Sequence, residues 1–187
     1  ITMVALIIIV VLVAIVIALI VMRNNLVVAR QRVKNAWSQI DVQLQRRFDL
    51  IPNLVETVKG YMAHESDVLE KVTSLRSSWT NAKTVEDKAS IDSSLSSTLK
   101  TIMALSENYP DLKANTNFMN LQDELSKTED KLSYSRQFYN DTVTKYNTQL
   151  EIFPSNIAAG LFGFNPEALF EVDNAEARKN VKVDFGK

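Results

Sequence analysis

Groupings of ionisable side chains that could bind a metal or act in catalysis are few in this sequence. His64 is the only histidine, and Glu65 and Asp67 are the carboxylates beside it. A metal site needs several His, Cys or carboxylate ligands at defined spacing, and the chain has neither a second histidine nor an HExxH pattern. We interpret this segment as a solvated helix face and predict no metal site.

Paired carboxylates are the other arrangement that can perform acid–base chemistry. Asp41, Asp49 and Glu56 lie near Arg46 and Arg47 in the sequence. Ion pairs between helices, or a helix cap at Asp49, account for these charges more simply. The chain also has no cysteine, no glycine-rich phosphate loop and no G-x-S-x-G motif. We therefore predict that the protein is not an enzyme and has no catalytic residues and no cofactor.

The elements that would position any site begin with an apolar segment, Ile1 to Met22, which has no charged residue. A helix of this length extends about 33 Å, which is enough to cross a hydrocarbon core of about 30 Å. The segment lacks the basic start, the short apolar region and the small-residue cleavage site of a secretory signal peptide. We predict that residues 1–22 form a transmembrane helix.

Basic residues gather directly beyond this segment. Up to residue 47 the chain has six basic residues and one acidic residue, and such enrichment next to a span favours the cytoplasmic side of a membrane. Near a membrane surface each basic residue gains about 1 kcal/mol from anionic phospholipid head groups. The residues predicted to make this contact are Arg23, Arg30, Arg32 and Lys34. Because the span holds them beside the bilayer, we predict lipid and not nucleic acid as the partner.

The rest of the chain repeats apolar residues every three or four positions, as amphipathic helices do. The chain has four glycines and four prolines, with none of either between Ile1 and Ile51, so long helices are favoured. The periodic segments cover residues 33–51, 54–79, 91–105 and 118–150, with a polar connection at 81–86. The first segment can continue the span as one rod, and Trp37, Trp79 and Leu125 are predicted core residues. We predict an all-α fold, in which an N-terminal transmembrane helix precedes an antiparallel four-helix bundle with long helices.

The composition changes at Pro154, where the sequence becomes small and apolar. We predict that this segment docks on the bundle or on a neighbouring subunit, and that the last dozen residues form a short extended arm. The predicted domains are residues 1–22 (transmembrane helix), 23–153 (bundle) and 154–187 (docking segment and tail).

Some of the apolar residues are candidates for contacts between copies of the chain. The tail has more apolar surface than a monomer usually leaves in water. In the span, Ala14 and Ala18 form a small-xxx-small pair, which lets two helices approach closely. The predicted oligomer contacts are Ala14, Ala18, Ile157, Leu161, Phe162 and Phe164.

Three long segments resemble the LemA family of bacterial membrane proteins. They are NAWSQIDVQLQRRFDLIPNLVETVKGYMAHE (35–65), NFMNLQDELSKTEDKLSYSRQFYNDTVTKYN (117–147) and FPSNIAAGLFGF (153–164). The resemblance implies an anchored helical bundle in the bacterial inner membrane, without an established enzymatic activity. It also implies an association with membrane zinc metalloproteases, whose genes often lie beside those of the family.

Two functions of different classes remain open. The first is a non-enzymatic scaffold, in which copies of the chain form a homo-oligomer at the bacterial membrane. The alternative is an adaptor or regulator of a membrane protease or envelope-stress system, which would add a membrane metalloprotease to the partners.

We predict that the part beyond the span faces the cytoplasm, because the basic residues follow the span closely. A cysteine placed at Asn115 should therefore resist a membrane-impermeant thiol reagent in intact cells and react after lysis. Labelling in intact cells would show the opposite orientation.

Overall fold

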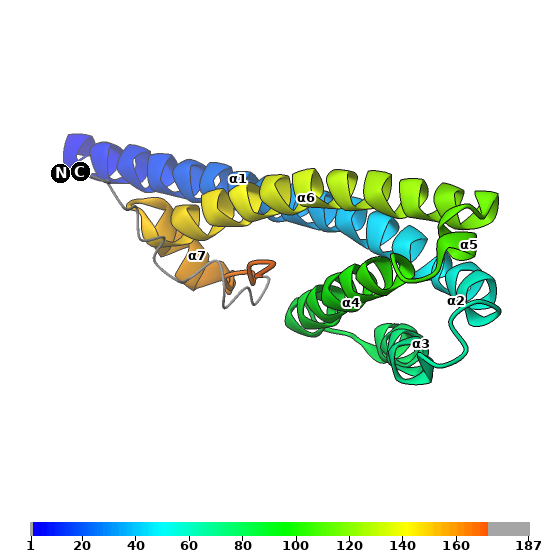
Figure 1. Ribbon diagram of the computed structural model, residues 1–187. Helices are drawn as coiled ribbons and strands as arrows, with labels where there is room; N and C mark the ends of the chain where they lie inside the picture. Colours follow the sequence, from blue (N-terminus) through cyan, green and yellow to red (C-terminus); the bar gives the residue numbers. More distant parts are fainter. Residues whose placement is uncertain (1, 172–187) are drawn as a thin grey trace, which may run out of the picture. The chain divides into compact units, whose positions relative to one another are not determined.

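The computed structural model describes residues 2–171, and every regular element in that range is an α-helix (Figure 1). The elements are α1 (Thr2–Asp49), α2 (Ile51–Lys59), α3 (Ser66–Asn81), α4 (Val85–Ser106), α5 (Pro110–Lys113), α6 (Thr116–Glu151) and α7 (Ser155–Phe162). The predicted all-α class is confirmed. The predicted extended arm lies outside the described residues.

The chain divides into two compact units. Unit 1 is built from residues 2–42 and 132–169, which are the first part of α1, the second part of α6, and α7. Unit 2 is built mainly from residues 43–131, which include α2 to α5. The antiparallel arrangement of four long helices stays a prediction.

Helix α1 is one uninterrupted helix of 48 residues. It continues through Asn24 and Asn25, as expected from a sequence without glycine or proline in this region. Its first part exposes apolar side chains on all sides, and α1 contains the one described stretch that is long and apolar enough to cross a membrane. From Leu26 onward the helix becomes amphipathic, and Val33 and Ile40 are buried.

The predicted helix over residues 54–79 is wrong in one respect, because the structure has two helices there. Helix α2 ends at Lys59, and the amides of Tyr61 and Met62 donate to the carbonyl of Val58 and close its last turn. Gly60 favours this end because glycine destabilises a helix interior by about 0.5–1 kcal/mol. Met62 is fully buried in the connection, so the apolar pattern continued across the break and hid it.

Two helix starts are fixed by side-chain caps. The Thr84 hydroxyl accepts a hydrogen bond from the amide of Asp87, so α4 begins six residues before the predicted Ile91. The Asn115 side chain accepts from the amide of Phe118 and caps α6. A cysteine at Asn115 would remove this cap, and exposed Ser97 on α4 is the better labelling position.

Aromatic residues contribute differently to the two units. In unit 2, Trp79 is buried and stacks on Phe48, with ring centroids 4.8 Å apart and planes 10° apart. In unit 1, Trp37 is half-buried and meets Tyr139 edge to face at 5.6 Å. The core position predicted for Trp79 is confirmed, whereas Trp37 lies at the margin of the core.

We predict that Leu125→Ala lowers the free energy of unfolding by about 2–5 kcal/mol, because Leu125 is 5% exposed and the substitution leaves a cavity. Met119→Ala is the control, since Met119 lies on the same helix and is 55% exposed. Thermal unfolding of both variants in mild detergent measures the difference. Equal melting temperatures for Leu125→Ala and the parent chain would contradict this core assignment.

Candidate membrane-surface site

The candidate site lies in unit 1, where α7 packs against the end of the apolar part of α1 (Figure 1). Ala158 and Ala159 of α7 are buried against Leu26, which is itself 1% exposed. The methyl side chains of the two alanines allow the helices to approach closely. Residues packed around this contact are Leu19, Met22, Leu150 and Phe164.

The turn between α6 and α7 is closed by Ser155. Its hydroxyl is within hydrogen-bonding distance of the carbonyl of Gln149, at 2.6 Å, and of Ile152, at 3.0 Å. Gln149 belongs to the last turn of α6, where carbonyls lose their helical partners. Ile152 is the first residue beyond α6, and its carbonyl also accepts from the amide of Asn156. Pro154 precedes α7 and has no amide hydrogen to donate, so α6 cannot simply continue. The serine therefore fixes where α7 begins.

The end of α7 turns the chain back toward α1. Gly163 adopts the left-handed conformation, with φ of 67°, which other residues rarely adopt. The amide of Phe164 donates to the carbonyl of Ala159 at 3.0 Å, as in the Schellman motif. Phe164 thereby reaches the apolar contact between α7 and α1.

The outward face of α7 remains uncovered by the described chain. Ile157 is 53% exposed, Leu161 65% and Phe162 41%. Ile152 and Phe153, just before the helix, are also exposed. The helix from Ser155 to Phe162 has no charged residue. Ala158 and Ala159 are therefore buried on α1, and Phe162 lies beside them under Arg23. On the open side, Ile157 and Leu161 are exposed apolar residues next to exposed Asn156.

Two of the predicted lipid-contacting arginines lie over the aromatic rings of this segment. The guanidinium carbon of Arg23 is 5.6 Å from the ring centroid of Phe162, and that of Arg30 is 5.1 Å from the ring of Phe164. Both distances are those of cation–π contacts. The structure thus brings residues predicted as lipid contacts together with residues predicted as oligomer contacts.

The other predicted site residues lie apart from these pairs. Lys34 is exposed on α1, and Arg32 lines a groove of about 690 Å³ between α1 and α6. In the span, Ala14 is exposed and Ala18 is half-buried.

Three side chains of α6 hold the segment after α7. The hydroxyls of Tyr139 and Tyr146 donate to the carbonyls of Ala168 and Asn165, at 2.8 and 3.0 Å. The amide group of Asn147 donates to the carbonyl of Glu167 and accepts from its amide, both at 2.9 Å. Sequence reasoning missed this contact, because the tyrosines fit an apolar stripe and Asn147 carries no motif.

The Tyr146 hydroxyl is suited to this role. Burial raises the pKa of its phenol, although the nearby Arg30 guanidinium acts in the opposite direction and the Glu167 carboxylate adds to the increase. The phenol therefore keeps its proton and remains a donor to Asn165 at neutral pH.

Unit 2 carries the ion pairs that involve Arg46 and Arg47. Arg47 is buried and contacts Asp92 at 2.6 Å and Glu129 at 2.9 Å. Asp92 is also fully buried, and removing one partner of such a pair typically costs about 3–5 kcal/mol. Arg46 and Arg47 therefore form ion pairs between helices with acids of α4 and α6, which were not among the partners named from the sequence.

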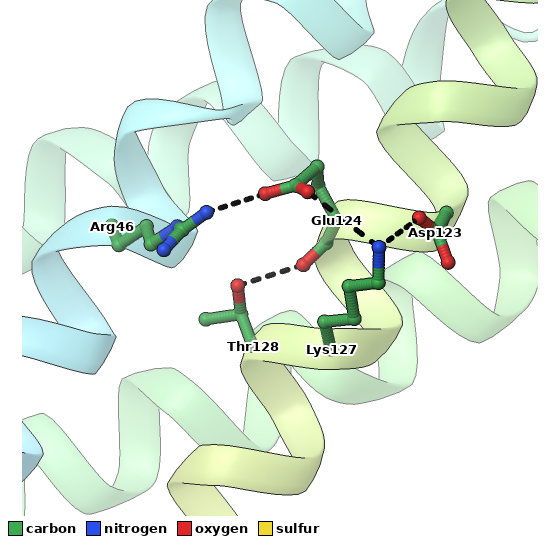
Figure 2. Close-up of polar contacts among 5 residues, drawn as sticks. All are labelled: Arg46, Asp123, Glu124, Lys127 and Thr128. Atoms are coloured by element: carbon green, nitrogen blue, oxygen red, sulfur yellow. Dashed lines mark hydrogen bonds and ion pairs between the residues drawn. The ribbon is translucent and has the colours of Figure 1, made fainter.

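The second set of ion pairs lies on the surface of unit 2. Figure 2 shows Arg46 reaching Glu124, while Lys127 lies between Asp123 and Glu124 on the outside of α6. The carbonyl of Glu124 also accepts from Thr128. Exposed pairs of this kind contribute about 0–1 kcal/mol each, so we assign them a structural role.

The remaining candidates for chemistry stay isolated. Asp49 accepts a hydrogen bond from Gln45 within α1 and does not cap α2, whose N-cap is Leu50, so the predicted cap is wrong. His64 is exposed. Among residues 2–171, no three His, Asp or Glu side chains are grouped as metal ligands would be.

We predict that Asn147→Ala speeds amide exchange in residues 165–168, because it removes two hydrogen bonds that contribute about 0.5–1.5 kcal/mol each. Thr148→Ala is the control, since Thr148 is exposed and its hydroxyl donates to the carbonyl of Thr144 in the same helix. Hydrogen–deuterium exchange measures both. Unchanged exchange of the Glu167 amide in Asn147→Ala would contradict the assigned contact.

Comparison with known proteins agrees with the resemblance carried by the three sequence segments. The model of the LemA family matches residues 36–185. Protein LemA of Metamycoplasma hominis is 28% identical over 82% of this chain and 71% of its own length. Magnetosome proteins MamQ 1 and MamQ 2 of Paramagnetospirillum magneticum are 25% identical over 79% of this chain, which spans 64% of their length. The chain belongs to the LemA family.

Proposed function

We propose that this chain is a non-enzymatic scaffold, anchored in a bacterial membrane by α1 and assembled from several copies of itself. Family membership and the apolar part of α1 are consistent with a membrane-anchored bacterial protein. Self-assembly, the absence of catalysis, the inner membrane and the cytoplasmic orientation are parts of the proposal.

The observation that carries the proposal is the continuity of α1. The same helix contains the apolar segment and the amphipathic segment that begins at Leu26. Because no loop separates them, the orientation of the span in the membrane sets the orientation of unit 1. Anchored copies are therefore aligned in one direction and held at one height, which favours side-by-side assembly.

A groove in unit 1 supports a role other than catalysis. It lies between α1 and α6, and no histidine or carboxylate lines it. Its ionisable lining residues are Arg32, Lys145 and Tyr146. None of these three side chains is a carboxylate or an imidazole, and the apolar lining of the groove includes the exposed ring of Phe138.

We propose Ala14 and Ala18 as contacts between copies within the span. Ala14 is exposed in the single chain, and neighbouring side chains such as Val10 and Ile17 are exposed as well. Lipid provides no hydrophobic drive for helix association, so close packing at small residues is what can favour it.

The native mass of the full chain in mild detergent tests the proposal, and a multiple of the single-chain mass is expected. The double variant Ala14→Leu/Ala18→Leu should shift the distribution toward single chains, because the larger side chains keep the helices apart. The matched control is Val16→Leu/Ile20→Leu, which alters two residues with the same spacing on the opposite face of α1.

A single-chain mass for the parent protein would rule out the scaffold. If that single chain also co-purified with a membrane metalloprotease, the adaptor function would replace it. If the two double variants assemble equally, Ala14 and Ala18 do not form the contact between copies, but the proposal of a scaffold still stands.

A further inference from the structure

The position of α7 along α1 suggests a second membrane contact in this protein. Helix α7 packs on Leu26 and on Leu19 and Met22, which are among the last residues of the apolar segment. At about 1.5 Å per residue, Leu19 lies only about 5 Å inside the end of that segment. If α1 crosses the bilayer, as proposed above, α7 lies where the hydrocarbon core meets the head groups.

The outward face of α7 has the chemistry of a surface in contact with acyl chains. Ile157, Leu161 and Phe162 are exposed and apolar, and the helix between Ser155 and Phe162 has no charge. Removing apolar surface from water is favourable by about 25 cal/mol per Å², so exposure of this face to water is unfavourable. Contact with lipid acyl chains avoids this free-energy cost. Ile152 and Phe153 extend the same apolar surface.

Two features favour lipid over a second copy of the chain as the occupant. Helix α7 packs directly on the last residues of the apolar segment of α1, and both helices carry exposed apolar side chains, such as Ile17 and Ile20 on α1 and Ile157 and Leu161 on α7. In addition, the Arg23 guanidinium lies over the ring of Phe162, and with α1 as the anchor this cation, one residue beyond the apolar segment, can reach the lipid phosphates. A lipid surface requires only this depth and polarity, whereas a protein partner would also need a matching shape.

We propose that α7 is an interfacial membrane helix, with Ile157, Leu161 and Phe162 among the acyl chains of the leaflet from which the amphipathic part of α1 emerges. Helices of this kind lie in the interface with their apolar face buried about 5–10 Å. Unit 1 is then held to the membrane at two elements, and α7 prevents it from tilting freely about the span. This inference rests on α1 being the anchor, as proposed above, but not on the number of copies.

Single-cysteine variants of this chain provide the test, because its sequence has no cysteine. A nitroxide label is attached at Leu161→Cys, at Ile9→Cys in the span and at Ser97→Cys on α4, with the protein in vesicles of phosphatidylcholine and phosphatidylglycerol. Collision rates with oxygen, which enriches in lipid, are compared with those of a water-soluble nickel chelate. The oxygen-to-nickel ratio at Leu161 should be severalfold higher than at Ser97 and closer to that at Ile9.

The outcomes separate the possible occupants. A ratio at Leu161 equal to that at Ser97 would place α7 in water and overturn the proposal. Low collision rates with both reagents would indicate cover by protein, and would support a second copy in place of lipid. An aqueous ratio at Ile9 would overturn the anchor itself, and the inference about α7 with it.

Discussion

A polypeptide inside a bilayer must satisfy its own backbone hydrogen bonds, and α1 meets this constraint as one helix that continues beyond the apolar segment. The same backbone pattern persists past Met22, where the side chains change from uniformly apolar to amphipathic. The apolar segment and the amphipathic segment that begins at Leu26 are therefore parts of one helix. The orientation of the apolar segment therefore also determines the direction of the buried face of α1 formed by Val33, Ala36 and Ile40.

The contact between α7 and α1 depends on small side chains at one place. Ala158 and Ala159 let α7 approach Leu26 closely, and Gly163 supplies the backbone conformation that returns Phe164 to the same contact. Bonds from Tyr139, Tyr146 and Asn147 then hold the following segment on α6. Together these interactions leave apolar side chains on the far face of α7, and this exposed face is what requires a functional explanation.

Much of the fold could be predicted from the sequence, because long helices without breakers leave a clear periodic pattern. Apolar spacing and proline positions predict the extent of helices α1 and α6 and the break at Pro154. The separation of α2 from α3 did not, since the buried Met62 continued the helical spacing across the loop. The cap at Thr84 was also missed, so α4 begins earlier than its apolar stripe indicated.

The candidate site was predictable only in part. The sequence indicated the possible roles of four residues of the site, which are Arg23, Arg30, Phe162 and Phe164. It did not indicate that they form two cation–π pairs, because more than 130 residues separate the partners in each pair. Buried Asp92 lies in a serine-rich segment where nothing marks it as the partner of Arg47. Contacts between distant segments depend on tertiary packing, which periodicity does not encode.

Hydrogen–deuterium exchange of the full chain in lipid vesicles tests the central claim, that the apolar segment and the amphipathic segment of α1 form one rigid helix. We expect slow amide exchange without interruption from the apolar segment through Asn24 and Asn25 to Val42, because each amide there bonds within α1. A fast-exchanging window at the two asparagines would reveal a flexible joint. The span would then no longer orient unit 1, and the account would be contradicted.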